Sequence, residues 1–254
     1  MERAAPRAGR AVRSVWLEGR ARREAGGGRQ PSGLDRGRIV AATVRLLDAD
    51  GLARFSMRRL AAELNVTAMS LYWYVDTKDD LLELALDTAF GELRLPEADA
   101  GGEWREQLRA LATEYRVLLV RHSWLPPLAG TYLNIGPNAL SFSRAVQGVV
   151  RRTGLPAYRQ MAAVSAVFQF VYGFGTIEGH FLARCADAGL TQDAGHRQAM
   201  SAMTQAPEAA EVVREAVEIM AARGGDTVEE MRERDFRYAL ELLVAGIEAM
   251  VARG

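Results

Sequence analysis

The chain has 254 residues, 49% of them hydrophobic and 25% charged, and its formal net charge at neutral pH is zero. This composition is typical of a soluble globular protein with room for one large or two small domains. Its single cysteine, Cys185, excludes an intramolecular disulfide, and we find neither an apolar run that reaches membrane-spanning length nor a signal peptide. We therefore expect a cytoplasmic protein without a membrane partner.

Residues 1–33 are rich in glycine, arginine and alanine, and we predict that they form a flexible extension. Arginine dominates this end of the chain, whereas residues 206–235 are rich in acids. This asymmetry suggests an anionic partner at the front, because a local field attracts phosphates even when the total charge is zero. A solvated tail with no partner explains residues 1–30 equally well, and both interpretations stay open.

Helical periodicity runs through almost the whole chain from Leu34 onward, and no convincing strand alternation occurs. We therefore predict an all-α protein. Four helices are expected in its first part, over residues 35–50, 56–64, 67–74 and 77–93. Asp35, Ser56 and Thr77 are residue types that cap helix N-termini, and Gly51 is placed to end the first helix.

Pro96 and the glycine pair at 101–102 separate this part from a second series of helices. These helices are expected over residues 104–122, 136–154, 156–187, 207–223 and 227–254. The last one begins with a capping box at residues 227–230. Residues 189–206 lack a helical pattern and are predicted to form a loop. The expected domains are therefore residues 34–94 and 103–254.

The most informative segment is residues 55–78, FSMRRLAAELNVTAMSLYWYVDTK. It predicts two short helices joined by a tight link at Asn65-Val66, where asparagine tolerates a left-handed backbone. Two such helices form a helix-turn-helix, which offers its second helix to the major groove of DNA. Leu60, Leu64 and Leu71 are expected to pack this pair on the first helix.

Side chains on the outward face of this motif are the candidates for contacts with DNA. Hydroxyls and amphipathic rings reach phosphates and base edges, and methyl-bearing side chains contact thymine. The candidates are Ser56, Arg58, Thr67, Ala68, Met69, Ser70, Tyr72, Trp73, Tyr74 and Lys78. A plain surface role is the alternative for Arg58, Ser70, Tyr72 and Lys78, and packing is the alternative for Trp73.

Residues 34–93 resemble the DNA-binding domain of the TetR family of bacterial repressors. The matching segments are LDRGRIVAATVRLLDADG, SMRRLAAELNVTAMSLYWYV and DTKDDLL. LYWYV is similar to the LY-x-HV ending of the family's recognition helix, with Tyr74 where histidine is common. The resemblance implies a three-helix DNA-binding domain that a fourth helix joins to a larger ligand-binding and dimerisation domain.

The rest of the chain is similar to the C-terminal domain of tetracycline repressors. The similarity rests on Trp104 and His122 at the two ends of a helix, on Gly130-Thr131, and on the order of the late helices. It implies a ligand pocket in each subunit and a homodimer formed by the long helix and the final helix. Leu111 and Tyr115 replace polar drug contacts, so magnesium-tetracycline is not the expected ligand.

Aromatic and polar residues within apolar helices are the candidates for ligand contacts, because small-molecule sites combine an apolar cavity with a few polar groups. They are Tyr115, His122, Trp124, Tyr132, Asn134, Phe142, Gln169, Tyr172 and Glu178. For each of them alone, a place in the core or on the surface is a more common explanation than a ligand contact. His122 and His180 lack the spacing of metal ligands, and no catalytic or cofactor motif occurs.

We expect a transcriptional regulator that is not an enzyme. In this hypothesis a dimer represses by binding a palindromic operator in double-stranded DNA, and an unknown small-molecule effector releases it. One alternative is a small-molecule-binding protein or enzyme with a vestigial helix-turn-helix. Another is a constitutive DNA-binding protein without a ligand cavity. The sequence does not identify the effector, the operator or the regulated genes.

Overall fold

The computed structural model describes residues 14–17, 34–96 and 102–253, and every regular element within these ranges is a helix. The predicted all-α fold is confirmed. The described chain divides into two compact units. Of the described residues, the N-terminal unit contains those up to Gly91 together with Pro127–Leu140, and the C-terminal unit contains those from Glu92 to Pro126 and from Ser141 onward. The predicted boundaries differ from these units at residues 127–140, which belong with the N-terminal helices.

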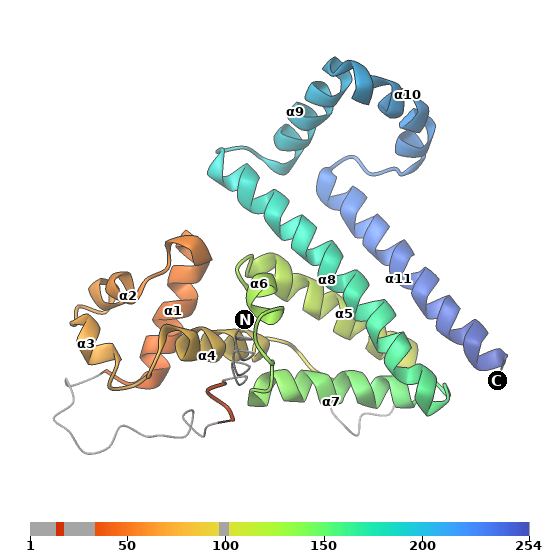
Figure 1. The fold of residues 1–254 in the computed structure, drawn as a ribbon. Coiled ribbons are helices and arrows are strands. Elements are labelled where there is room, and N and C mark those ends of the chain that lie inside the picture. The colour runs from red at the N-terminus through yellow and green to blue at the C-terminus, as the bar shows by residue number, and fades with distance from the viewer. Residues whose placement is uncertain (1–13, 18–33, 97–101, 254) are drawn as a thin grey trace, which may run out of the picture. The chain divides into compact units, whose positions relative to one another are not determined.

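The helices of the N-terminal unit are α1 (Arg36–Asp50), the short 3-10 helix η2 (Leu52–Arg54), α2 (Met57–Glu63), α3 (Ala68–Leu71) and α4 (Lys78–Phe90) (Figure 1). The side chains of Asp35, Ser56 and Thr77 accept hydrogen bonds from the backbone N–H groups three residues later, so the predicted caps are confirmed. Helix α3 is shorter than expected, because turns replace the helix after Leu71.

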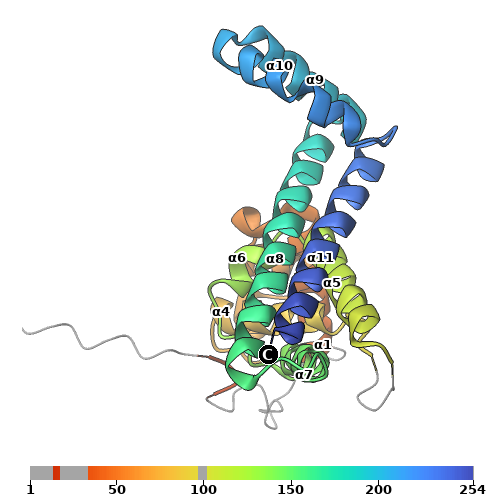
Figure 2. The ribbon, with the colours of Figure 1, turned by 90° about the vertical axis from the view of Figure 1, so that its right-hand side faces the viewer.

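The remaining helices are α5 (Trp104–Arg121), α6 (Leu125–Ala129), α7 (Pro137–Arg151), α8 (Ala157–Asp187), α9 (Gln192–Gln205), α10 (Pro207–Ala222) and α11 (Val228–Ala252). In the C-terminal unit α8 lies beside both α5 and α11, and the α9–α10 pair follows the end of α8 (Figures 1 and 2). Gly175 and Gly179 allow the approach of α5 and α8. A Cβ added at Gly175 would lie 3.0 Å from Cβ of Leu119.

The prediction of a loop over residues 189–206 is wrong, because α9 occupies most of this range. Thr191 caps the helix by accepting a hydrogen bond from the N–H of Ala194, and Asp193 lies in its first turn. None of its residues is buried, so it lacks the apolar stripe on which recognition by periodicity depends. The carboxylate of Asp193 also accepts from the N–H of Val228 at 2.8 Å, which ties α9 to the start of α11.

Four residues within the predicted flexible extension have a defined place. Ser14 and Val15 are buried, and both donate hydrogen bonds to the carboxylate of Glu83 on α4, at 2.6 and 3.2 Å. The prediction of flexibility is therefore wrong for residues 14–17, where a short turn packs on a helix. The other residues of the extension lie outside the described ranges.

We expected no apolar run as long as a membrane span, but helix α8 is long and apolar enough to be one. It includes an 18-residue stretch with a mean hydropathy of 1.2, and 22% of this stretch is buried within the chain. Length and composition alone do not distinguish a membrane span from a helix that packs against protein, since core helices of soluble proteins meet the same criteria.

Candidate DNA-binding surface and ligand-binding cluster

Helices α2 and α3 form a helix-turn-helix with a rigid link. Asn65 has a φ of 53°, in the left-handed region that asparagine tolerates, as predicted. The backbone N–H of Val66 donates to the carbonyl of Ala61 at 2.9 Å, and Leu60 and Leu71 are fully buried. The packing of the two helices therefore fixes which residues face outward.

Helix α3 and the turn after it expose the largest apolar and aromatic side chains of this motif. Met69 is 71% exposed, Tyr72 is 44% exposed and Trp73 is 75% exposed. Large apolar side chains that stay exposed to water contribute little to the stability of the chain. Their presence on this surface therefore suggests a partner that covers them. Of the other predicted contacts, Thr67 is exposed and Ala68 is half-buried.

The shorter polar candidates in the motif all take part in local hydrogen bonds. The hydroxyls of Thr67 and Ser70 lie 2.8 Å apart, and Thr67 also caps α3 by accepting from the N–H of Ser70. Ser56 caps α2. Arg58 is exposed on the first turn of α2. These residues stay candidates, but Ser56, Thr67 and Ser70 also stabilise the helix ends that present the surface.

Tyr74 is not placed as the sequence prediction requires. Its side chain is 6% exposed, and its hydroxyl donates to the carbonyl of Leu34 at 2.9 Å. Its own carbonyl accepts from the guanidinium of Arg36, at 2.9 Å from Nη2. Tyr74 therefore anchors the start of α1 to the end of the motif, and we correct the prediction by removing it from the candidate DNA contacts. The sequence resemblance showed that tyrosine stands here where histidine is common, but it did not indicate that the side chain is buried.

Lys78 has a structural contact in addition to its predicted one. Its Nζ donates to the carbonyl of Phe55 at 3.0 Å and lies 5.3 Å from the centroid of the Phe55 ring. This contact holds the N-terminus of α4 against the start of α2. An ammonium group has three N–H donors, so hydrogen bonding to a phosphate stays compatible with this position.

In the C-terminal unit, three aromatic rings from α5, α7 and α8 form a cluster. The centroids of Tyr115 and Phe142 are 5.2 Å apart, and Phe168 lies 6.2 Å from Tyr115 and 5.6 Å from Phe142. Burial raises the pKa of the Tyr115 hydroxyl, so this group stays neutral at all ordinary pH values. Tyr172, whose hydroxyl donates to the carbonyl of Pro126 at 2.8 Å, also acts on the Tyr115 pKa. We call Tyr115, Phe142, Phe168 and Tyr172 the aromatic cluster.

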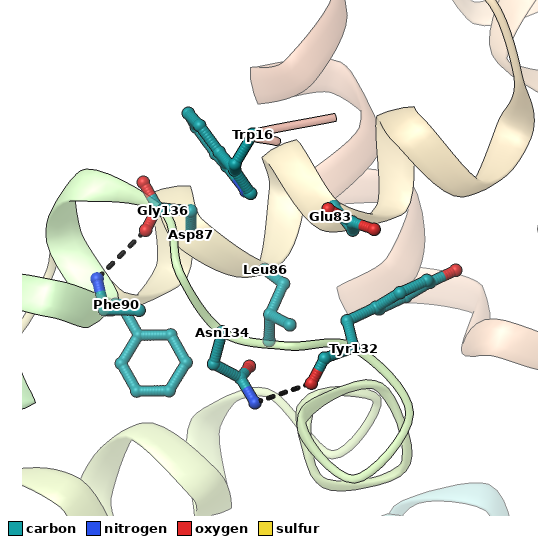
Figure 3. Close-up of a pocket in the computed structure, with 9 residues that line it drawn as sticks. Trp16, Glu83, Leu86, Asp87, Phe90, Tyr132, Asn134 and Gly136 are labelled. Carbon is teal, nitrogen blue, oxygen red and sulfur yellow. Dashed lines mark hydrogen bonds between the residues drawn. The ribbon is translucent and has the colours of Figure 1, made fainter. Parts of the chain in front are cut away.

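The other predicted ligand contacts are not gathered around this cluster. Glu178 forms a buried ion pair with Arg116, and Gln169 is exposed. His122 lies 3.2 Å from the carboxylate of Glu92, and its ring centroid is 5.4 Å from that of Trp124. Tyr132 and Asn134 belong to the N-terminal unit, where they line a cavity against α4 (Figure 3).

Trp16, Glu83 and Asp87 are among the residues of that cavity that sequence reasoning missed. Trp16 lies in the segment that was predicted to be flexible. Glu83 and Asp87 share one face of α4, and helical periodicity alone does not show which segment packs against that face. Within the ranges that the structure describes, no group of three or more His, Cys, Asp or Glu residues is arranged to hold a metal ion.

Two protein-family models match this chain. Residues 39–85 match the model described as bacterial regulatory proteins of the tetR family. Residues 95–251 match the model described as the tetracyclin repressor-like C-terminal domain. The chain belongs to the TetR family. It is accordingly a transcriptional regulator that binds DNA through its helix-turn-helix, and the resemblance seen in the sequence is confirmed.

Curated relatives of this TetR-family regulator are regulators too. It is 41% identical over 176 residues to an HTH-type transcriptional regulator of Saccharopolyspora erythraea, with 69% of this chain and 71% of that protein covered. It is 36% identical over 164 residues to the HTH-type transcriptional repressor DrrR1 of Streptomyces coeruleorubidus, covering 65% and 59%. Tetracycline repressor class D of Escherichia coli is 25% identical over 224 residues, covering 86% and 91%.

Solved structures of TetR-family proteins have the same fold. ActR of Streptomyces coelicolor in complex with actinorhodin superposes with a TM-score of 0.66 at 26% identity, covering 87% of this regulator and 99% of ActR. BioQ with its natural double-stranded DNA operator superposes with a TM-score of 0.56 at 25% identity, covering 85% and 99%. These structures contain, between them, the two kinds of partner predicted from the sequence.

Proposed function

We propose that this regulator is a cytoplasmic, homodimeric repressor that a small-molecule effector releases from a palindromic operator. The observation that carries the proposal is the exposure of Tyr72 and Trp73 on a helix-turn-helix whose link and caps are fixed by hydrogen bonds. Two copies of this surface in a two-fold symmetric dimer match two half-sites of a palindrome in successive major grooves.

The aromatic cluster supports an effector site in the C-terminal unit. Rings from three helices offer an apolar surface, and the hydroxyl of Tyr115, which burial keeps neutral, adds a polar group to it. The related regulator ActR has been solved in complex with a small molecule, actinorhodin, and a small-molecule effector fits the same family fold here. An effector changes operator affinity only through its differential affinity for two conformers of the dimer. No enzymatic step enters this proposal.

The exposed faces of α8 and α11 support the dimer. From Ala157 to Ile177, the exposed residues of α8 carry no charge, and they include Tyr158, Met161 and Ile177. The exposed residues of α11 from Leu242 to Met250 are also uncharged. Two adjacent helices with such faces form a contiguous patch that water solvates poorly, and a second copy of the chain covers it in this proposal. The apolar character of α8 then reflects subunit association, and a membrane span is not required.

We expect Leu242→Glu to convert the dimer into a monomer at micromolar concentration. Leu242 is 75% exposed in the single chain, so the substitution leaves the folding of one subunit intact while it places charges at the subunit contact. Sedimentation equilibrium measures the mass. Val117→Glu on α5, another exposed apolar position, serves as the matched control and should stay dimeric. A monomeric wild type, or one that is recovered solely from the membrane fraction, would contradict the dimer.

Fluorescence anisotropy with labelled DNA from the regulator's own upstream region tests the proposed function. We expect saturable binding at one dimer per palindrome, with a steep dependence on salt because phosphate contacts release counterions. Addition of candidate aromatic effectors should then release the labelled DNA. Binding that is equally weak for all sequences would contradict the operator. Ligand binding without any DNA affinity would favour the vestigial helix-turn-helix.

A further inference from the structure

The outward face of α3 and of the turn after it carries no charged or amide side chain. Its exposed and half-buried residues, which we call the α3 surface, are Thr67, Ala68, Met69, Ser70, Tyr72 and Trp73. The side chains that specify a base pair by paired hydrogen bonds are arginine and lysine for guanine and asparagine and glutamine for adenine, and acids accept from cytosine. None of these residue types occurs between residues 67 and 75. The α3 surface therefore does not distinguish base pairs by hydrogen bonds of that kind.

The short hydroxyl side chains of the α3 surface are committed to each other and to the helix. Oγ1 of Thr67 and Oγ of Ser70 lie 2.8 Å apart, so one hydroxyl hydrogen is engaged within this pair. Oγ1 of Thr67 also accepts from the backbone N–H of Ser70 at 3.2 Å, which caps α3. Turning either hydroxyl toward a base would break one of these bonds. The hydroxyl of Tyr72 can donate a single hydrogen bond, which a phosphate oxygen accepts as well as a base edge does.

Apolar groups are what the α3 surface offers to base edges. Met69 is the second residue of α3, and its side chain is largely exposed, as is that of Trp73. In helix-turn-helix proteins the first residues of the second helix contact base edges in the major groove. The C5 methyl of thymine is the apolar group that base pairs present in that groove. The flexible thioether of Met69 can pack against such a methyl, and this contact removes apolar surface of both groups from water.

We propose that the α3 surface recognises A·T base pairs by their thymine methyl groups, with Met69 as the principal contact. This inference rests on the operator binding proposed above, and it adds the chemistry by which α3 reads the operator. Charged hydrogen bonds to the DNA then come from side chains on either side of α3. Arg58 on α2 is exposed, and Lys78 on α4 has N–H donors beyond the one that binds the carbonyl of Phe55.

Selection by the full chain from a random pool of duplex DNA identifies the operator, and deoxyuridine then tests how α3 reads it. Deoxyuridine in place of thymidine removes the C5 methyl and keeps every hydrogen-bonding group of the base. A buried methyl contributes about fourfold to affinity, so its removal from both half-sites should weaken binding about 15-fold at the position that contacts Met69. Deoxyuridine outside the half-sites should leave the affinity within about twofold, because no methyl there contacts α3. Fluorescence anisotropy at constant salt measures each affinity.

Met69→Ala locates the methyl contact on the protein. Met69 is largely exposed, so the substitution leaves the folded chain intact. We expect weaker binding of the thymine operator, and a deoxyuridine effect that falls from about 15-fold to less than about fivefold, because the methyl has lost its partner. Arg58→Ala, on α2, serves as the matched control. It should weaken the binding of both operators and keep the deoxyuridine effect at about 15-fold, since the guanidinium does not share that contact.

The outcomes separate this inference from the proposed function. If a palindrome is selected but deoxyuridine changes its affinity at no position, operator binding stands and the methyl readout is wrong. The readout is also wrong if 7-deazaadenine, which lacks the N7 acceptor, weakens binding at the paired adenines as much as deoxyuridine does, because α3 then reads by hydrogen bonds. A deoxyuridine effect that Met69→Ala leaves unchanged overturns the assignment of Met69. A selection that enriches no sequence contradicts the proposed function, and the inference with it.

Discussion

A Tyr72→Ala/Trp73→Ala variant is expected to bind the operator at least about 100-fold more weakly than wild type. Each contact to a base edge contributes roughly 1–3 kcal/mol, and the dimer presents each side chain to two half-sites. A combined loss of about 3 kcal/mol already exceeds 100-fold. Both side chains are largely exposed, so their removal should leave the folded chain intact. Fluorescence anisotropy with the palindrome measures the affinity.

Tyr74→Phe is the matched control for this prediction. It removes a hydroxyl two residues from Tyr72, but this hydroxyl is buried against the carbonyl of Leu34. We expect operator affinity close to that of wild type and a loss of about 1 kcal/mol in the free energy of unfolding. The two results together separate the exposed surface from its support. If Tyr74→Phe weakened DNA binding as much as the double variant, the assignment of the surface would be incorrect.

Removal of the Arg116 side chain is expected to cause a large loss in the free energy of unfolding. Arg116 and Glu178 are 9% and 11% exposed, and two hydrogen bonds of 2.7 and 3.0 Å join them. The guanidinium also bonds to Glu233 at 2.7 Å and lies 4.5 Å from the centroid of the Phe236 ring. Burial lowers the pKa of Arg116, but these carboxylates more than compensate, so the group is firmly charged.

Arg116→Ala leaves Glu178 buried and without its partner, which typically costs about 3–5 kcal/mol. At roughly 2–4 °C per kcal/mol for a chain of this size, the Tm should fall by about 6–20 °C at constant protein concentration. Arg116→Met/Glu178→Met should recover most of this loss, because an apolar pair needs no countercharge. Arg94→Ala breaks an exposed ion pair with Glu114 and should leave the Tm nearly unchanged. Calorimetry that finds equal losses for Arg116→Ala and Arg94→Ala would refute the argument.

Local sequence signals predicted the N-terminal helices well. Caps at Asp35, Ser56 and Thr77 and the left-handed backbone of Asn65 are properties of a few neighbouring residues, and the structure confirms them. The buried leucines of α2 and α3 followed from helical spacing. The helix at residues 192–205 was missed because its stability does not depend on an apolar stripe.

The candidate sites were harder to predict because they depend on contacts between distant segments. Tyr74 belongs to the same exposed-looking run as Tyr72 and Trp73, and its burial depends on Leu34, forty residues away. Glu178 is a polar residue in an apolar helix, as a ligand contact would be, but its partner Arg116 is on another helix. Trp16 lines the cavity against α4 together with Glu83 and Asp87, and no periodicity in the sequence relates Trp16 to these two acids.

Helix α9 connects α8 and α10 without burying any of its residues. Its local opening would expose little new apolar surface, so the free energy of that opening should be far below that of global unfolding. Amide hydrogens of α9 should then exchange with solvent much faster than those of α8, although both segments are helical. Among the long helices that the structure describes, α9 should therefore be more susceptible to a protease than α8. Most sequence changes in α9 should also be tolerated more readily than changes in the helices that contain the core. Gly195 is the exception, because a Cβ added there would lie 2.6 Å from Sγ of Cys185 on α8.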